Sequence, residues 1–485
     1  MKIIRTLPAL FASFLGLIVA VPHLQAQLTW TGGTTNASDF SNYTGTLGTP
    51  PYDFIFDTAT NTTGLTGSPG SANNLTFSGA GRPTYSFDEA SLNLAGNITV
   101  TGSAAEITFG SNYAFILSNN SHSIDVGGAN VEIWGPIAGG GSAGIAKYGY
   151  GYLTLGGYNS FSGGVKIHDG TLLLGSSSYY SSFWNGDGYT IIDYGPVGSS
   201  SSILKLDAGT TLGLAASGGS YSLSNNIGLC FTGLVNVDTG DGGDLTLNGT
   251  ISGSSTLNVA GYGSLTLNGS NTYTGGTTVN SGAILNLGSD SNIDGSIISS
   301  PVGTGTLTLN GGSEIDNLTV GTITLANNIV LSGGYDNYAH VEEESADFKL
   351  TGQITGMGGI DWCTTSILTL TNANNTFSGG IDMREGMLLL GASSIGTPGN
   401  ATAGPVGTGG IIMYGDSTLG VAPLAGSITL HNNIQINSDT EFPAYFDASN
   451  GNLTLLGGIS GTGVLQITGT GAVTLTGNNT FSGDL

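Results

Sequence analysis

The residues best suited to contact a ligand are aromatic and lie close together in one segment. Residues 176–193 hold five of them, at Tyr179, Tyr180, Phe183, Trp184 and Tyr189. Exposed aromatic rings stack on sugar rings and anchor protein partners. The same rings could instead fold back onto the body of the protein and serve only its packing. We treat these five residues as a candidate binding site, and both interpretations stay open at this point.

Residues that could perform catalysis are few and scattered. The closest grouping of charged side chains around a basic residue is Asp382, Arg384 and Glu385. Polysaccharide hydrolysis needs paired carboxylates, and elimination needs a basic residue. The four histidines that follow residue 26 each stand alone in the sequence. We therefore expect no catalytic residue and no enzyme activity, with a polysaccharide lyase or hydrolase as the alternative.

One Gly-rich turn offers oxygen ligands for a metal ion. It holds Asp238, Asp241 and Asp244, and closely spaced carboxylates can bind Ca²⁺. The repeating Gly and Asp pattern of calcium-binding β-rolls is not present in the sequence around them. A solvated loop is therefore the favoured interpretation, and we expect neither a metal nor a cofactor.

Charge and the first residues exclude some partners and indicate export. The chain of 485 residues has 8 Lys+Arg against 32 Asp+Glu, whereas nucleic-acid binding needs a basic surface. Residues 1–26 combine a basic start, an apolar run and a small residue at Ala26, as in a secretory signal peptide. Removing Lys2 and Arg5 leaves 6 basic residues and a net charge of −26 (6 minus 32). We expect a secreted or surface protein that is soluble once mature and binds no nucleic acid.

The segments that must position these residues form a repeat within a repeat. Four motif copies place an aromatic residue at Phe161, Tyr273, Phe377 and Phe481, with spacings of 112, 104 and 104 residues. Within these units, apolar–polar–apolar triplets typical of strands return about every 21 residues. This pattern predicts an all-β fold, a right-handed parallel β-helix or β-solenoid with coils of about 21 residues. A propeller or a string of small sandwiches is the alternative, but five triplets per unit cannot all pair into hairpins.

The chain divides into three expected parts. They are a signal peptide at 1–26, an N-terminal β cap with the first coils at 27–130, and the solenoid of long repeats at 131–485. The cap is expected because a bare first coil would expose an unpaired edge. The last motif copy stops in mid-motif at Leu485. We therefore expect the natural sequence to continue, with any membrane anchor in that missing part.

Spacing also bears on the aromatic segment and on the two cysteines. Between the triplets at Leu172 and Leu204 there are 32 residues, where the other units use 22 or 23. The aromatic segment is thus an insertion, and insertions in solenoids fall on loops.

Cys230 and Cys363 should lie several coils apart, too far for a disulfide. We expect both to be small core residues.

The repeated motif resembles a known family. Residues 263–285 and 151–172 show its pattern best: Gly, Leu-Thr-Leu, Asn-Thr or Asn-Ser, an aromatic residue and Gly-Gly. This pattern is similar to the autotransporter-associated β-strand repeat, also called the passenger-associated transport repeat. The resemblance implies a β-helical passenger, secreted or at the cell surface or outer membrane of a Gram-negative bacterium. Together with the regular repeat and the lack of paired catalytic residues, the resemblance favours a non-catalytic passenger or stalk for adhesion or surface display. The aromatic insertion suggests surface glycans or proteins as its partners.

Overall fold

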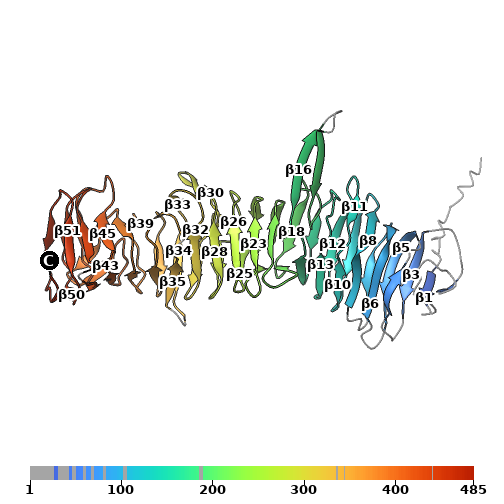
Figure 1. Ribbon diagram of the computed structural model, residues 1–485, viewed down its shortest axis with the longest axis horizontal. Coiled ribbons are helices and arrows are strands. Elements are labelled where there is room, and N and C mark those ends of the chain that lie inside the picture. Colours follow the sequence, from blue (N-terminus) through green and yellow to red (C-terminus); the bar gives the residue numbers. More distant parts are fainter. Residues whose placement is uncertain are drawn as a thin grey trace, which may run out of the picture.

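The computed structural model is a long rod built from parallel strands (Figure 1). The all-β solenoid expected from the sequence is confirmed. The expected signal peptide, residues 1–26, lies outside the described residues. In the described part of the chain, no helix is long and apolar enough to cross a membrane. The structure describes residues 27–30, 43–45, 51–57, 62–66, 70–79, 84–101, 106–184, 189–334, 337–342, 345–439 and 441–484.

Each turn of the solenoid places strands on up to three faces, which we number in chain order. Strands on one face pair in parallel with strands on the same face of the neighbouring turn, except where an irregular segment or a hairpin takes the place of a strand. Face one comprises β9 (Ser121–Asp125), β12 (Gly144–Tyr148), β14 (Val165–Ile167), β18 (Ile203–Asp207), β21 (Asn226–Cys230), β24 (Ile251–Gly253), β33 (Ile323–Leu325), β36 (Phe348–Leu350), β39 (Ile367–Leu370), β41 (Met387–Leu390), β45 (Thr418–Val421), β48 (Ala444–Asp447) and β51 (Leu465–Thr468).

The other two faces are built in the same way. Face two comprises β10 (Asn130–Ile133), β13 (Tyr152–Leu155), β15 (Thr171–Leu174), β19 (Thr211–Leu214), β22 (Leu234–Asp238), β25 (Thr256–Ala260), β27 (Thr277–Val279), β31 (Leu307–Asn310), β34 (Ile329–Ser332), β37 (Ile354–Gly356), β46 (Ile428–Leu430), β49 (Leu453–Leu455) and β52 (Val473–Leu475). Face three comprises β20 (Ser220–Leu223), β23 (Asp244–Leu247), β26 (Ser264–Leu267), β28 (Ile284–Leu287), β32 (Glu314–Asn317), β35 (Tyr338–Val341), β38 (Gly359–Trp362), β40 (Ile381–Met383), β44 (Ile411–Tyr414), β47 (Ile434–Asn437) and β50 (Ile459–Gly461).

The first turns have longer strands and an aromatic core. β1 (Gln27–Trp30) pairs antiparallel with β2 (Tyr43–Gly45) and parallel with β3 (Tyr52–Phe56). In the core, Phe87 stacks on Phe109 with 4.9 Å between ring centroids and 13° between ring planes. Stacked rings of this kind bury a large apolar area with few side chains. The remaining strands of this end are β4 (Thr62–Thr66), β5 (Ser71–Phe77), β6 (Thr84–Leu94), β7 (Ile98–Val100), β8 (Glu106–Leu117) and β11 (Ile137–Gly139).

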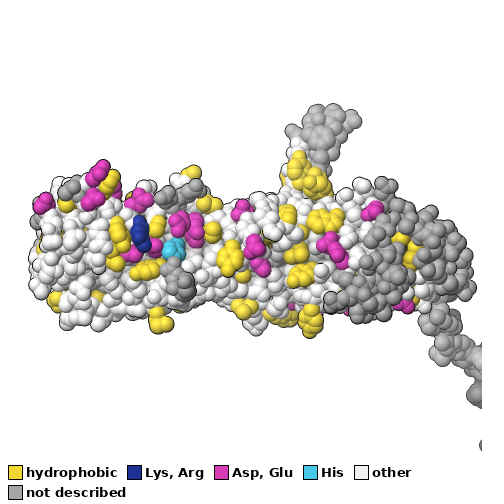
Figure 2. All heavy atoms as spheres, turned by 60° about the horizontal axis from the view of Figure 1, so that its bottom comes forward, with side chains coloured by type: hydrophobic (Ala, Val, Ile, Leu, Met, Phe, Trp, Pro, Cys, Tyr) yellow, Lys and Arg dark blue, Asp and Glu magenta, His cyan; other side chains and the backbone are white. Residues whose placement is uncertain are grey.

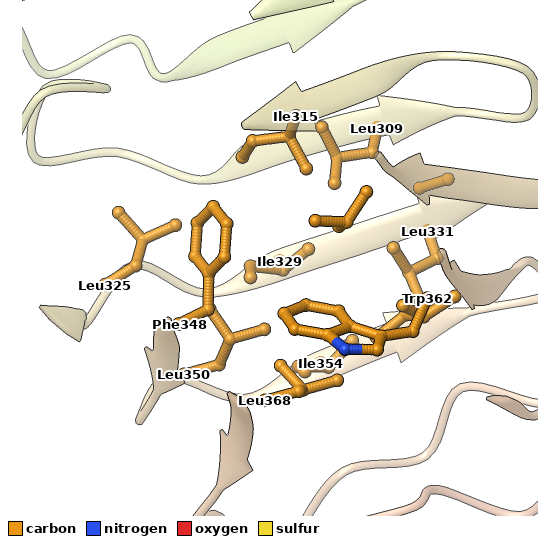
Figure 3. Close-up of a pocket in the computed structure, with 13 residues that line it drawn as sticks. Leu309, Ile315, Leu325, Ile329, Leu331, Phe348, Leu350, Ile354, Trp362 and Leu368 are labelled. Atoms are coloured by element: carbon orange, nitrogen blue, oxygen red, sulfur yellow. The ribbon is translucent and has the colours of Figure 1, made fainter. Parts of the chain in front are cut away.

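Inward side chains of the later turns form one continuous aliphatic stack. Leu245, Leu265 and Leu285 occupy matching register positions on β23, β26 and β28 and are fully buried, as the triplets predicted. The core keeps a void of about 30 Å³ beside Phe348 and Trp362 (Figure 3). Its lining is apolar, so the void offers no partners for water. It is also too small for a sugar, and we look for the functional site on the outside of the rod.

Both cysteines are free thiols at outward-facing positions. The expectation that they fill the core was wrong, because each is only half-buried. Side chains alternate between the two sides of a strand. Cys230 follows the buried Leu229 and Cys363 follows the buried Trp362, so each thiol points outward.

Each long unit carries a β-hairpin in the place of one strand. The aromatic insertion lengthens the first hairpin, which the other two units carry in a shorter form. The base of the first bonds to face three, through the Ser178 N–H and the Ser222 carbonyl at 2.7 Å. The bases of the second and third bond to β33 on face one and to β46 on face two. The hairpins are β16 (Tyr179–Trp184) with β17 (Tyr189–Tyr194), β29 (Asn292–Asp294) with β30 (Ser296–Ser299), and β42 (Ile395–Thr397) with β43 (Asn400–Ala403).

Successive long units are therefore displaced by one face around the rod. The Leu-Thr-Leu strand of the motif lies on face two in β13, face three in β26, face one in β39 and face two again in β52. This corrects the expectation of one coil for every triplet. Leu307, the next triplet after Leu285, pairs with Thr277 on face two instead of continuing the stack on face three. The hairpins consequently leave the rod in different directions.

An asparagine in the repeated motif bonds across turns to a Pro-Val-Gly segment that follows the motif in the chain. Asn271 is fully buried; its Oδ1 accepts the N–H of Ile251 at 2.7 Å and its Nδ2 donates to the Pro301 carbonyl at 2.6 Å. We call this arrangement the asparagine clamp. The motif therefore marks a structural contact between turns and not a ligand site. The same pair of bonds is made by Asn159 with Ile137 and Pro196, and by Asn375 with Ile354 and Pro405.

Candidate functional site

The candidate aromatic site lies on the longest hairpin, β16–β17, which projects away from the rod (Figure 1). Across the hairpin, Tyr179 pairs with Tyr194 and Tyr180 pairs with Asp193. Tyr179 is 47% exposed and Tyr180 is 62% exposed, so both rings are accessible to a partner. The strand positions of the other three aromatic residues are described, but the side chains of Phe183, Trp184 and Tyr189 lie outside the described part of the structure.

The foot of the hairpin is held by hydrogen bonds to the solenoid. The carboxylate of Asp193 accepts the Ser200 N–H at 2.7 Å and the Ser200 hydroxyl at 3.0 Å. On the other side, the Ser178 hydroxyl accepts the Ser224 N–H at 3.1 Å. These contacts fix the direction in which the hairpin leaves the rod. Fixed aromatic side chains lose little conformational entropy when they bind.

Two further aromatic residues lie at the foot of the hairpin. The sequence analysis did not group them with the five candidate residues. Tyr194 stacks on Tyr179 with 5.2 Å between ring centroids. The ring of Tyr158, from the turn below and 60% exposed, lies 4.6 Å from that of Tyr194. The rings form a row, Tyr158–Tyr194–Tyr179. Figure 2 shows hydrophobic side chains gathered at this foot.

A groove of about 550 Å³ runs beside the row, and we call it the aromatic groove. Trp134, Tyr158 and Tyr179 line it together with glycines and with Ser176, Ser177 and Ser178. Its volume falls in the range of about 300–1,000 Å³ usual for ligand pockets. Aromatic rings can stack on the C–H faces of a sugar while the hydroxyls bind its polar groups. The aromatic groove therefore has the composition of a carbohydrate site.

The Trp134 ring lies flat because the next two turns carry glycine beneath it. A Cβ atom at Gly156 would lie 2.2 Å from the indole ring, and one at Gly175 would lie 2.8 Å from it. The Trp134 Nε1–H donates to Glu132 at 2.9 Å, which fixes the ring in its plane. A signal for this site was present in the sequence. Trp134, Gly156 and Gly175 are spaced by 22 and 19 residues, about one coil each.

The charged residues around Arg384 form an ion-pair network on face three. The Arg384 Nε donates to Asp361 Oδ1 at 3.0 Å, and its Nη2 lies 3.5 Å from Asp382 Oδ2. His340 Nδ1 lies 3.4 Å from the other oxygen of Asp361. The guanidinium also stacks over Tyr414, at 4.9 Å from the ring centroid. The arginine is thus already engaged by Asp361 from the preceding turn and by Asp382 from its own turn, and its pair with Asp361 braces the two turns against each other.

The environment of this network makes the neighbouring thiol unreactive. Burial, and then the charge of Asp361, raise the pKa of the Cys363 thiol to about 12. The thiol therefore stays protonated at neutral pH and is a poor nucleophile.

In the Gly-rich turn, Asp238 accepts the Gly240 N–H at 2.9 Å and Asp244 accepts the Ser264 hydroxyl at 2.6 Å. Among the described residues, no three His, Cys, Asp or Glu side chains come together as metal ligands.

One carboxyl on the same face leads to a pH-dependent prediction. Burial, and then a hydrogen bond and the negative charges of Asp316 and Glu342, raise the pKa of Glu314 from 4.5 to about 8. The folded state keeps a proton in this range that the unfolded chain has lost, so stability should fall as the pH rises from 4.5 to 8. Glu314→Gln mimics the protonated form. At pH 8 its free energy of unfolding should be about 1 kcal/mol higher than that of the wild type. The difference is no larger because the group is partly solvated.

Denaturant unfolding at pH 5 and pH 8 measures this difference. Asp241→Asn, at an exposed position in the Gly-rich turn, is the control and should keep the pH dependence of the wild type. An unchanged pH dependence in Glu314→Gln would contradict the prediction.

The fold and the candidate site together define a class of protein: a parallel β-solenoid of long repeats that projects hairpins from its faces. The family model of the Passenger-associated-transport-repeat matches residues 145–174, 257–285, 365–390 and 465–485. The chain therefore carries this repeat in four places, and the resemblance found in the sequence is confirmed.

A comparison with curated proteins finds a relative that is much longer than this chain. The chain is 30% identical over 420 residues to the protein named Adhesin BmaC autotransporter, from Brucella suis biovar 1 (strain 1330). The matched region covers 84% of this chain and 11% of that protein, so the chain spans about a ninth of the relative's length. No solved structure matches the chain.

Proposed function

We propose that the chain is part of a non-catalytic passenger that a Gram-negative bacterium secretes or displays on its surface, and that it serves adhesion. The four passenger-associated transport repeats and the adhesin relative support this proposal. The single observation that carries the adhesive role is the projecting β16–β17 hairpin with the aromatic groove at its foot. The proposed partners are surface glycans, or proteins that carry them.

The alternative of a polysaccharide lyase or hydrolase has weaker support. It would need a free basic residue or a pair of activated carboxylates. Arg384 is instead bound by Asp361 and Asp382. Arginine held in this way cannot remove a proton from a sugar. We therefore favour binding without turnover.

The aromatic groove can be tested by removing its rings. Tyr158→Ala combined with Tyr179→Ala should reduce binding of protein-coated beads to epithelial cells by about tenfold, since each stacked ring contributes about 0.5–1.5 kcal/mol. Replacing residues 179–194 by a short Gly-Ser turn should have at least the same effect. The β-type circular-dichroism spectrum should be unchanged, because these side chains lie outside the core.

The control is Tyr262→Ala, which removes a ring that is 72% exposed in a turn far along the chain from the hairpin. It should bind cells as the wild type does. Equal binding by the wild type and by both groove variants would overturn the adhesive role of the hairpin. Release of sugar fragments by the wild-type protein, lost in Asp382→Ala, would overturn the non-catalytic assignment.

A further inference from the structure

A second groove lies on the other side of the long hairpin and has a different chemistry. The chain enters the hairpin along the aromatic groove, and it leaves the hairpin along a groove of about 260 Å³ that includes Ser201 and Ile203. Two lysines, Lys166 and Lys205, line this second groove together with serines and glycines. We call it the lysine groove.

The two lysines lie directly opposite each other on neighbouring strands. Lys166 on β14 and Lys205 on β18 are register partners in a parallel pair. Like charges at such positions destabilise a sheet. Lys166 is partly compensated, since its Nζ lies 3.6 Å from Asp207 Oδ1, but the other oxygen of Asp207 is bound by His168 at 2.9 Å. Within the described residues, no acidic group lies within ion-pair distance of Lys205, which is exposed.

This pairing is unusual in a chain with so few cations. The chain carries 8 Lys+Arg and a formal net charge of −24. Five of these basic residues lie in the described part, and one of the five, Lys147, is buried. Two of the remaining four share one groove. An unbalanced positive pair in an acidic protein is a local site for an anion, and a bound anion would remove the repulsion between the lysines.

The serines and one aromatic ring indicate what kind of anion fits. The hydroxyls of Ser142 and Ser162 donate to main-chain carbonyls at 2.8 and 2.7 Å, so their oxygens remain free to accept hydrogen bonds from ligand hydroxyls. Phe231 does not line the groove itself but lies next to it, since its ring is 66% exposed and its centroid is 5.9 Å from Lys166 Nζ. Its φ of 66° is costly for a residue other than glycine, and such strain is typical of functional positions. A ligand with hydroxyls, an apolar face and a negative charge would use all three features.

We propose that the lysine groove binds an acidic sugar, with the carboxylate or sulfate group between Lys166 and Lys205 and the sugar ring beside Phe231. This inference deepens the proposed function, on which it rests for its biological use, by naming a charged glycan as a second contact of the same hairpin region. The binding itself can be measured on the purified protein without cells.

The test uses the full chain and three tetrasaccharide probes in calorimetric titrations. A hyaluronan tetrasaccharide carries only carboxylates, a neocarratetraose sulfate carries only sulfates, and cellotetraose is neutral. The wild type should bind at least one charged probe, with an affinity that falls as salt is added. Lys205→Gln should weaken that binding at least tenfold, and Lys166→Gln with Lys205→Gln should abolish it. Phe231→Gly, which tolerates the positive φ, should weaken it severalfold.

Lys349→Gln is the matched control, because Lys349 is also exposed on a strand of face one. It should bind the charged probes within twofold of the wild type. Lys205→Gln should melt at or above the wild-type temperature, since it removes a like-charge contact, so lost binding cannot be attributed to unfolding. The inference is overturned if the wild type binds neither charged probe, if Lys205→Gln binds as the wild type does, or if Lys349→Gln loses as much.

The outcome is separable from that of the proposed function. Tyr158→Ala with Tyr179→Ala should keep its affinity for the charged probe, because those rings line the aromatic groove. If Lys205→Gln loses the charged probe while the wild type does not adhere to cells, the lysine groove stands and the adhesive role fails. If the lysine variants bind the charged probes as the wild type does while the aromatic variants lose cell adhesion, the adhesive role stands and the lysine groove is overturned.

Discussion

Replacing Asn271 by Ala should lower the free energy of unfolding by about 3 kcal/mol. The side chain is fully buried and closes the asparagine clamp between Ile251 in the preceding turn and Pro301 in the next one. Alanine would leave a buried N–H and a buried carbonyl without partners, and each costs about 1–3 kcal/mol. Because turns of a solenoid contact only their neighbours, the damage should centre on this joint. Chemical denaturation, with hydrogen exchange at the Ile251 amide, measures both effects.

Two further variants separate the clamp from a general effect of losing an asparagine. Asn268→Ala removes an exposed asparagine of the same motif copy and should cost less than 0.5 kcal/mol, about the limit for ordinary surface changes. Asn271→Asp can still accept the Ile251 N–H, but it cannot donate to Pro301. It should therefore be destabilised as well, and more so at pH 7 than at pH 4. Equal stability of Asn271→Ala and Asn268→Ala would show that the clamp contributes nothing.

The parts of the fold that the sequence predicts are those set by alternation and by coil length. Leu245 and Leu265 are 20 residues apart, and the structure stacks them in register. The surplus residues before Leu204 were correctly read as an insertion outside the core, since a regular coil has no room for them. Of the three aromatic residues that line the aromatic groove, the sequence singled out only Tyr179, because it belongs to the insertion whereas Trp134 and Tyr158 come from earlier turns.

The parts that the sequence does not predict depend on which face a strand occupies. A triplet has the same local pattern on each of the three faces, so Leu307 looks like the next step after Leu285 although it lies on face two. The shift arises because a hairpin fills one strand position in each unit. The sequence does not predict that Lys166 and Lys205 are register partners, and the reason is the same. They are 39 residues apart in the sequence, and only the exclusion of the hairpin from the coil makes them neighbours.

Lys147 is the clearest case of a core residue that composition and spacing did not reveal. It stands where other motif copies have Val259 and Trp362, and its register partners on the adjoining turns are Ile124 and Ile167. Its side chain is fully buried. The ammonium group donates to the carbonyl of Gly149 at 2.6 Å and to that of Asp169 at 2.7 Å. These two bonds let a charged end remain in an otherwise apolar interior.

The buried Lys147 should make the solenoid more stable at alkaline pH. Burial lowers the pKa of its ammonium group from 10.5 to about 8, against the smaller opposing effects of Asp169 and Asp125. Between these pH values the unfolded chain holds a proton that the folded protein has released, so stability rises with pH over this window. The gain is on the order of 3 kcal/mol, at about 1.4 kcal/mol for each pH unit.

Denaturant unfolding at pH 7.5, 9 and 10.5 tests this prediction against two variants. Lys147→Met keeps the length of the side chain without the charge, so the alkaline gain should disappear. Lys349→Met changes an exposed lysine and should keep the gain. The difference between the wild type and Lys147→Met isolates the lysine from tyrosines and thiols that titrate in the same range. If the two proteins keep a constant difference in stability from pH 7.5 to 10.5, Lys147 is charged in the core throughout, and its two carbonyl partners fully compensate its burial.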